Sequence, residues 1–279
     1  MTASEESERE RARRRHQRVL FDRVAPLYEQ TRPGYPRALV EWVAATAGVA
    51  EGDPVLEVGC GTGQLTSGLA RLGFDLTAID ISPAMVEAAR AGAGEPRAGE
   101  RPVRFWAGSF EEFRAPDASV ALIVSAAAFH WLDPEVRFRK AARLLRPGGW
   151  LAVLDHAERY DEPFGSALRA MWQARNDGGG AWVARQADSD AFAGSGLFEA
   201  AVREVVTWRA RRPADAVVGV ESTRATSLSW PPDVQAGFAE EIRHRLAGHD
   251  GTGVTIESQV TMAQVAPEVW QYRPRDNAR

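Results

Sequence analysis

Residues 55–63 read Val-Leu-Glu-Val-Gly-Cys-Gly-Thr-Gly, and this stretch decides the fold. An apolar run, Pro54 to Val58, precedes three glycines at alternate positions, Gly59, Gly61 and Gly63, and leucines follow at helical spacing. The pattern predicts a buried strand, a tight turn and a helix. Glycines in the turn would let a ligand approach the backbone where a Cβ would clash. Backbone N–H groups at the start of the helix would face that ligand.

The residues around the turn favour a cationic ligand over a dinucleotide. The dinucleotide fingerprint needs glycine at the sixth position, where this chain has Gln64. Glu57 lies two residues before the first glycine, where its carboxylate would repel a pyrophosphate and attract a positive charge. S-adenosylmethionine (SAM) carries a sulfonium and an ammonium and no phosphate. The next predicted strand ends at Asp80, where a carboxylate would accept both ribose hydroxyls.

With these residues the chain resembles the class I SAM-dependent methyltransferases. Further stretches resemble a bacterial subgroup related to the trans-aconitate and ubiquinone-pathway enzymes: 21–28 (FDRVAPLY), 32–36 (RPGYP), 129–134 (FHWLDP) and 144–149 (LLRPGG). The likeness covers about residues 19–155 well and the remainder loosely. It implies the methyl donor and not the acceptor, because members of this subgroup do not share one acceptor.

The order of elements predicts an α/β fold with a doubly wound, Rossmann-like sheet. Strands are expected at 54–58, 76–80, 103–107, 121–125, 150–155, 201–208 and 253–265. Helices are expected at 37–47, 64–72, 83–90, 134–145, 163–175, 215–228 and 233–246. The resemblance implies a seven-stranded sheet with an antiparallel last strand, so that 211–250 forms a helical insertion or cap between the last two strands.

We divide the chain into four parts on this basis. Residues 1–18 are a flexible, charged N-terminal segment, and 19–50 form an N-terminal helical lid. Residues 51–155 are the SAM-binding core, and 156–279 hold the rest of the sheet with the substrate-binding insertion, about 211–250. Such a lid would exclude water when ligand binds.

Composition limits the classes of partner. The net charge is −4, which argues against broad binding to nucleic acid or to an anionic membrane. Nothing at the N-terminus resembles a signal peptide, and the apolar run 120–129 is too short to span a bilayer. We therefore expect a cytoplasmic monomer or homodimer that acts on a small molecule. Cys60 is the only cysteine, and His244 and His249 are not spaced as metal ligands, so no disulfide and no metal site is expected.

The resemblance also implies which residues contact the donor. Ser109 and the Phe110 backbone would recognise adenine, although the family often has an acidic residue where Ser109 stands. Met85 would pack on the adenine ring or in the core, and 125–128 would pass beside the methyl group. The full expected set is Tyr28, Glu57, Gly59, Cys60, Gly61, Gly63, Asp80, Ile81, Met85, Ser109, Phe110 and Ser125.

Methyl transfer is an in-line displacement, for which a protein aligns the reactants and excludes water. A base is needed only where the acceptor must lose a proton. His130, directly after the fourth strand, is a better candidate than His156, and a structural histidine is the alternative reading for both. Tryptophans after residue 156 are expected mainly in the core, with one or two lining an acceptor pocket: Trp172, Trp182, Trp208 and Trp230.

These observations predict a SAM-dependent methyltransferase whose acceptor is a small molecule, such as a specialised metabolite, methylated at O, N or C, with S-adenosylhomocysteine as product. One alternative is an enzyme of the same fold without net methyl transfer, such as a cyclase or a donor-modifying enzyme. Another is a non-catalytic SAM-binding partner protein. A nicotinamide oxidoreductase is disfavoured by Glu57 and Gln64.

Overall fold

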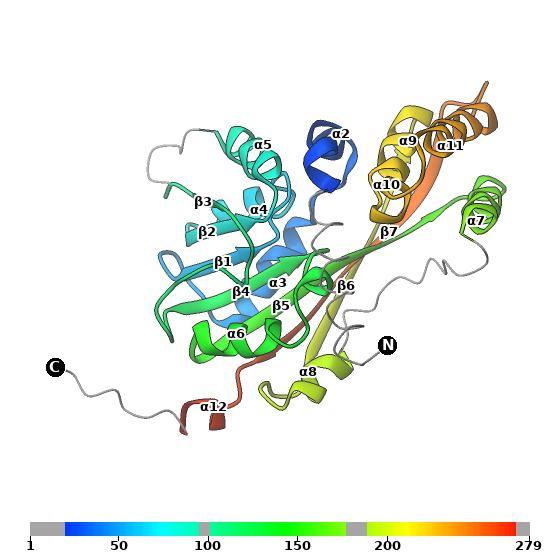
Figure 1. Ribbon diagram of the computed structural model, residues 1–279. Coiled ribbons are helices and arrows are strands. Elements are labelled where there is room, and N and C mark those ends of the chain that lie inside the picture. Colours follow the sequence, from blue (N-terminus) through cyan, green and yellow to red (C-terminus); the bar gives the residue numbers. More distant parts are fainter. Residues whose placement is uncertain (1–19, 95–100, 177–188, 272–279) are drawn as a thin grey trace, which may run out of the picture.

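The chain folds around one seven-stranded sheet with the strand order β3-β2-β1-β4-β5-β7-β6 (Figure 1). The computed structural model describes residues 20–94, 101–176 and 189–271. The strands are β1 (Pro54–Val58), β2 (Asp75–Asp80), β3 (Arg104–Ala107), β4 (Val120–Ala126), β5 (Leu145–Tyr160), β6 (Val202–Arg212) and β7 (Thr252–Gln264). The first five pair in parallel, and β7 runs antiparallel to both β5 and β6. The predicted α/β sheet with an antiparallel last strand is confirmed.

Helices cover both faces of the sheet, because successive strand residues point to opposite sides. On one face Leu122 and Val124 pack with α3 (Arg37–Ala47) and α4 (Thr66–Ala70). On the other face Ile123 packs with α6 (Arg137–Leu144) and α8 (Ser189–Ser195). The helix α5 (Pro83–Ala93) closes the ligand-facing edge, and the Ser82 side chain accepts from the Met85 N–H as its N-cap.

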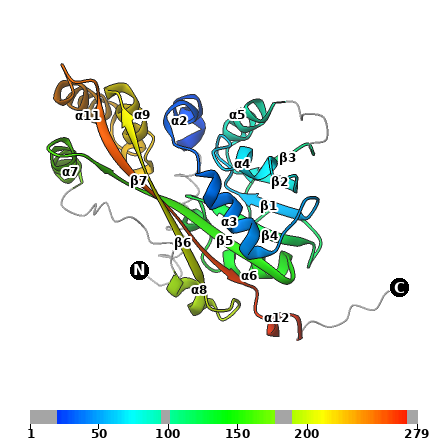
Figure 2. The same ribbon diagram turned by 180° about the vertical axis from the view of Figure 1, so that it is seen from behind.

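A second layer of helices covers the long extension of β5, β6 and β7 (Figure 2). It consists of α7 (Phe164–Arg175), α9 (Ala214–Ser222), α10 (Ala225–Leu228) and α11 (Pro232–Arg245). The last three connect β6 to β7, as the sequence predicts for 211–250. The single helix expected at 215–228 is instead two helices. Thr223 ends the first, its hydroxyl donating to the carbonyls of Gly219 and Val220, and Arg224 is extended, with ψ 139°.

Other boundaries also differ from the prediction. The helix expected from 134 begins at Arg137, and β5 begins at Leu145 and continues to Tyr160, well beyond 155. Two short helices were not expected: α8 and α12 (Glu268–Gln271). The predicted segment 1–18 and Trp182 lie outside the described residues. Within the described residues, every helix is too short or too polar to cross a membrane.

The N-terminal segment forms η1 (Phe21–Val24) and α2 (Ala25–Thr31). Asp22 Oδ1 accepts from Ser82 Oγ at 2.8 Å and from the Ala84 N–H at 3.0 Å, which attaches η1 to the start of α5. Figure 1 shows α2 between α5 and α9. A Cβ on Gly219 of α9 would lie 2.3 Å from Thr31, so α2 and α9 are in close contact. The segment therefore joins the core of the sheet to the insertion.

Candidate active site

The glycine loop after β1 folds tightly against the end of β2. Gly59, Gly61 and Gly63 have φ of 73°, 54° and 95°, in the left-handed region that favours glycine. A Cβ on Gly59 would lie 2.2 Å from the Cβ of Ala128, so no larger residue fits there. The N–H groups of Gly59 and Cys60 both donate to the Ile79 carbonyl. The loop thus brings backbone to the carboxyl ends of β1 and β2, where ligands bind in open α/β sheets.

Asp80 is fixed at the end of β2 by two backbone hydrogen bonds. Its Oδ2 accepts from the Gly61 N–H at 3.0 Å, and its Oδ1 accepts from the Ser82 N–H at 2.9 Å. An ionised carboxylate offers about four lone-pair sites, which is more than these two hydrogen bonds occupy. The side chain lines a cavity, in the position where the sequence predicts a ribose ligand.

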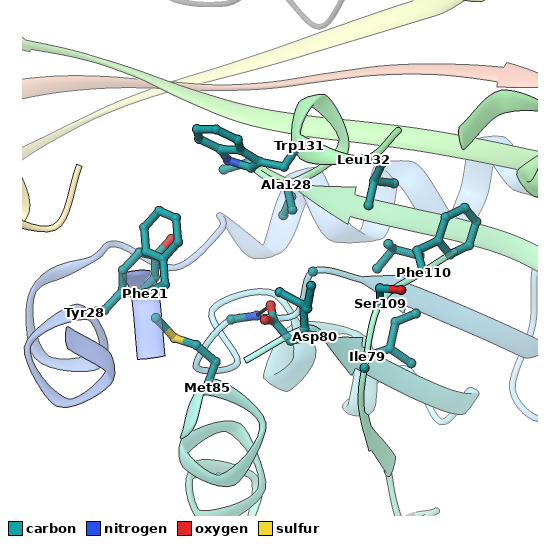
Figure 3. A pocket seen from close by; sticks show the side chains of 17 residues that line it. Phe21, Tyr28, Ile79, Asp80, Met85, Ser109, Phe110, Ala128, Trp131 and Leu132 are labelled. Carbon is teal, nitrogen blue, oxygen red and sulfur yellow. Dashed lines mark hydrogen bonds between the residues drawn. The ribbon is translucent and has the colours of Figure 1, made fainter. Parts of the chain in front are cut away.

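This cavity, which we name the apolar pocket, has an empty volume of about 670 Å³ including space open to solvent. Figure 3 shows Phe21 and Tyr28 on one side, Ser109 and Phe110 on the other, and Asp80 and Met85 between them. The complete lining is Phe21, Tyr28, Val58, Gly59, Gly61, Ile79, Asp80, Ile81, Met85, Gly108, Ser109, Phe110, Ala126, Ala127, Ala128, Trp131 and Leu132. Its size and largely apolar wall are typical of a small-molecule site.

Three residues that line this pocket also make contacts inside the protein: Met85, Ser109 and Phe110. Met85 is only 2% exposed, so it packs in the core and also lines the pocket. Ser109 lines the pocket, but its hydroxyl is engaged in its own turn: it donates to Glu112 at 3.1 Å and accepts from the Glu112 N–H. Phe110, buried beside it, also lines the pocket, and its side chain belongs to the hydrophobic core.

A second cavity, the polar pocket, adjoins the first over the glycine loop. Its empty volume is about 650 Å³, again including open space. The lining residues are Tyr28, Arg32, Pro33, Tyr35, Glu57, Gly59, Cys60, Gly61, Gln64, Leu65, Ala126, Ala127, Asp155, His156, Glu158 and Arg224. Tyr28, Gly59, Gly61, Ala126 and Ala127 belong to both pockets, so one extended ligand would reach from one into the other.

Glu57 is the least satisfied polar group in the polar pocket. The residue is 1% exposed, and neither carboxyl oxygen has a hydrogen-bond partner among the described residues. Burial raises its pKa to about 8, and the negative charge of Asp80 adds to this, while the nearby Thr66 hydroxyl lowers it somewhat without forming a hydrogen bond. A buried carboxyl without a partner is costly, and a cationic ligand would satisfy it. The observation fits the ammonium group of SAM.

Arg32 faces the same pocket and was not predicted as a site residue. Its Nε donates to Thr223 Oγ1 at 3.0 Å, and its guanidinium lies 5.0 Å from the centre of the Tyr28 ring. Among the described residues Arg32 forms no salt bridge within 4.0 Å. The only sequence signal is its place in the stretch 32–36, which resembles the bacterial subgroup.

The two candidate histidines have different surroundings. His156 lines the polar pocket and stacks on Tyr35 with ring centres 4.1 Å apart. Its Nδ1 lies 3.0 Å from Ser258 Oγ, which accepts from Trp208 Nε1, so we assign the serine proton to the bond with Nδ1. Burial lowers the pKa of His156 to about 4, and the imidazole is neutral at pH 7. It resembles a structural histidine.

His130 lies on the short helix η2 (Phe129–Trp131), with its ring 4.9 Å from that of Trp131. Ala128 and Trp131, on either side, line the apolar pocket, but His130 lines neither of the two cavities. Two more predicted residues also lie off both linings. Gly63 lines neither pocket and adopts the left-handed backbone conformation that the glycine loop needs. Ser125 is fully buried, and its hydroxyl donates to the Val58 carbonyl at 2.8 Å.

Three of the four tryptophans considered in the sequence lie in or against the hydrophobic core: Trp172, Trp208 and Trp230. Trp172 and Trp230 pack with ring centres 4.8 Å apart, and both contact Phe238. Neither they nor Trp208 line either pocket, so the expectation of one at the acceptor site is not met by these three; Trp131 lines the apolar pocket instead. Within the described residues, no three His, Cys, Asp or Glu side chains gather as a metal site would require.

Comparison with known proteins agrees with this geometry. The methyltransferase domain family model matches residues 56–153. The chain is 29% identical over 238 residues to an uncharacterized methyltransferase of Mycobacterium tuberculosis (strain ATCC 25618 / H37Rv), covering 85% of this chain and 89% of that protein. It is 33% identical to the demethylmenaquinone methyltransferase of Tropheryma whipplei (strain Twist), over 53% of this chain and 62% of that protein.

A solved structure extends the agreement to the fold. A protein from Anaeromyxobacter dehalogenans, described as a candidate type II methyltransferase, superposes with a TM-score of 0.55 at 27% identity. The match covers 85% of this chain and 99% of that one. The domain model, the curated relatives and this structure together support a class I SAM-dependent methyltransferase of bacterial type. In this methyltransferase, the matched stretch 56–153 spans β1 to most of β5 and holds the glycine loop and Asp80.

Proposed function

We propose that this methyltransferase transfers a methyl group from SAM to a small-molecule acceptor, such as a specialised metabolite. One observation carries the proposal: two cavities meet over the glycine loop, with the Asp80 carboxylate in one and the unpartnered, buried Glu57 in the other. An adenosine matches the first cavity, and a cationic amino-acid end matches the second.

Different residues would bind different parts of the donor. Met85 and Phe110 would hold the adenine, and Asp80 the ribose hydroxyls. Glu57 would pair with the ammonium, and the Arg32 guanidinium with the carboxylate. Gly59, Cys60, Gly61 and Gly63 would allow close backbone approach, while Tyr28 and Ile81 would cover the ligand. When bound, SAM supplies a methyl group on a positively charged sulfur, so the leaving group is already activated.

The chain itself would align the acceptor and exclude water. Ala126, Ala127 and Ala128 at the end of β4 are small, and Ala127 has a φ of 52°, so the backbone turns sharply there. This leaves room for an acceptor beside the glycine loop. Trp131 and Leu132 give that side an apolar wall, which suits an acceptor with a flat or hydrophobic body. The relative named as a demethylmenaquinone methyltransferase supports a small-molecule acceptor of this kind.

We also propose that His130 acts as the general base when the acceptor must lose a proton. General-base catalysis contributes about 10²–10⁴ in rate. His130→Gln should therefore lower kcat by at least about 100-fold with an acceptor that must lose a proton. A loss of less than about 10-fold would assign His130 a structural role.

The decisive experiment is incubation with methyl-labelled SAM and a panel of metabolites that present O, N or C nucleophiles. Incorporation of label into one acceptor class, with release of S-adenosylhomocysteine, supports the proposal. Donor consumption without a methylated product would favour an enzyme that modifies the donor or forms a ring. Binding of donor product with no turnover on any acceptor would favour a non-catalytic partner protein.

The proposal includes the organisation of the chain. Residues 19–50 would act as the lid, 51–155 as the donor-binding core and 211–250 as the acceptor-side insertion. A cytoplasmic location, a monomeric or homodimeric state and the lack of a nucleic-acid or membrane partner belong to the same proposal.

A further inference from the structure

A buried hydroxyl of the insertion forms a hydrogen bond with Arg32, which lines the polar pocket. Thr223, at the junction of α9 and α10, is 0% exposed, and its Oγ1 accepts from Arg32 Nε at 3.0 Å. The two residues are separated by 191 positions in the chain. The threonine proton points away from Arg32, because the hydroxyl donates to the carbonyls of Gly219 and Val220. These two helix carbonyls therefore orient the Thr223 hydroxyl so that a lone pair of its oxygen faces Arg32.

A buried ion network holds this junction in place. Arg224 donates to both oxygens of Glu221, at 2.8 Å and 3.0 Å, and lies 3.4 Å from Glu158. Glu158 also accepts from Arg212 at 2.6 Å, and Glu221 accepts from Trp172 Nε1 at 2.9 Å. Two arginines thus face two glutamates with their hydrogen bonds well satisfied, which fixes a geometry even where it adds little net stability.

Arg32 has donors left for a ligand. Thr223 occupies its Nε, and the two Nη nitrogens have no hydrogen bond to the described residues. The positive charge lies close enough to Glu158 to help lower the pKa of that carboxyl, but Glu158 is already paired with Arg212. The guanidinium lines the polar pocket together with Glu57, in the cavity where we place the amino-acid end of the donor. Its free face suits a carboxylate.

We propose that the α9–α10 junction is a positioning element for the methyl donor: Thr223 orients the Arg32 guanidinium toward the donor carboxylate. The insertion would then set donor affinity, beyond the acceptor-side role that its sequence suggests. The inference rests on the proposed function, since it needs SAM in the polar pocket. Thr223 acts through Arg32 and touches no ligand itself, so it is a positioning residue.

Two ligands separate this effect from a general loss of the site. S-adenosylhomocysteine carries the ammonium and carboxylate, whereas 5′-methylthioadenosine keeps the adenosine and lacks both charged groups. A change that acts through Arg32 weakens only the first ligand. A change that distorts the whole site weakens both.

The test is calorimetric titration of both ligands into the full-length protein and three variants, with melting temperatures measured alongside. Thr223→Val keeps the side-chain shape and removes the acceptor of the Arg32 hydrogen bond. It should weaken S-adenosylhomocysteine about 5-fold, the equivalent of a hydrogen bond worth about 1 kcal/mol, and leave 5′-methylthioadenosine unchanged. Thr223→Ser should restore the affinity. Thr226→Val, the same substitution at an exposed position on α10, is the matched control and should behave as the unchanged protein.

A second pair of variants covers the case in which Thr223→Val does not fold. Arg32→Lys keeps the charge but has no Nε to meet Thr223, so on its own it should show the same selective loss. Thr223→Ala also removes the acceptor, so alone it should weaken S-adenosylhomocysteine selectively, and in the Arg32→Lys background it should have no further effect on either ligand. Equal weakening of both ligands, or no weakening of either, would overturn the inference. Failure of the unchanged protein to bind S-adenosylhomocysteine would instead contradict the proposed function.

Discussion

At the level of single residues, Glu57 and Asp80 lie on either side of the glycine loop and differ in how their charge is satisfied. Asp80 accepts two backbone hydrogen bonds and lines the apolar pocket. Neither carboxyl oxygen of Glu57 has a hydrogen-bond partner in the part of the chain that the structure describes, and burial raises its pKa to about 8. Sequence spacing alone placed both residues at the loop. It did not predict that Asp80 would accept two hydrogen bonds or that the Glu57 carboxyl would be neutral at pH 7.

The raised pKa of Glu57 predicts that donor binding depends on pH. A cationic amino group favours the ionised carboxyl, so the affinity for S-adenosylhomocysteine should rise between pH 6 and pH 8, by at most about 10-fold per pH unit. Calorimetry in buffers of different ionisation enthalpy should show proton release on binding. In Glu57→Gln the affinity should be lower and flat over this range. A wild-type affinity independent of pH would contradict the pairing.

The raised pKa of Glu57 has the opposite effect on the stability of the ligand-free protein, which should fall as the pH rises. The folded chain keeps the Glu57 proton up to about pH 8, whereas an unfolded chain releases it near the ordinary value of 4.5. The unfolded state therefore binds fewer protons across this window, and the free energy of unfolding falls as the pH rises. Asp80, Cys60 and Tyr35 are the other titratable groups that face Glu57.

Asp80→Asn should weaken S-adenosylhomocysteine by about 10- to 150-fold, because a hydrogen bond to a charged group is worth about 1.5–3 kcal/mol. Titration calorimetry measures the loss directly. Asp75→Asn, at the opposite end of β2 and away from both pockets, is the matched control and should bind normally. Unchanged affinity in Asp80→Asn would remove this residue from the site.

At the level of elements, the predicted strands and helices from α3 to β4 agree with the structure to within three residues at each end, and Ser82 is the N-cap of α5. Local pattern fails where tertiary contacts decide. The strand was expected to end at 155, yet β5 continues to Tyr160 because residues 155–160 pair with residues 254–259 of β7. The break at Thr223 and Arg224 likewise depends on Arg32 and Glu158, which no local window contains.

Trp230 shows how the structure changes an expectation about the insertion. The sequence suggested a role in the acceptor pocket, but the ring packs on Trp172 and Phe238 and donates to Asn176. Trp230→Ala should therefore lower the free energy of unfolding by about 2–4 kcal/mol. Donor and acceptor binding should fall together at high temperature and be normal at low temperature. A selective rise in acceptor KM with an unchanged melting temperature would restore the acceptor role.

The N-terminal segment, residues 20–36, should become protected from hydrogen exchange when S-adenosylhomocysteine binds. It carries Tyr28 and Arg32 in the pocket walls, and it is attached at two ends, by Asp22 to α5 and by Arg32 to α9–α10. A lid of this kind closes over its ligand and excludes water. Exchange that is identical with and without ligand would show that the segment is a fixed wall.

At the level of the whole molecule, the sheet edge gathers residues from positions 21 to 224 around one pair of cavities. The sequence predicted the fold class, and it placed the glycine loop beside Asp80 because the two lie on consecutive elements. It missed Arg32, Trp131 and Arg224, because their place in the site depends on how distant elements pack. The N-terminal segment and the insertion are joined through the α2–α9 contact.

The central claim is that the two cavities bind one molecule of SAM. Titration calorimetry of S-adenosylhomocysteine into the full-length protein tests it most directly, with NAD as the competing ligand. We predict one site per chain for S-adenosylhomocysteine and no detectable heat for NAD. Absence of S-adenosylhomocysteine binding, or binding of NAD in its place, would contradict the claim.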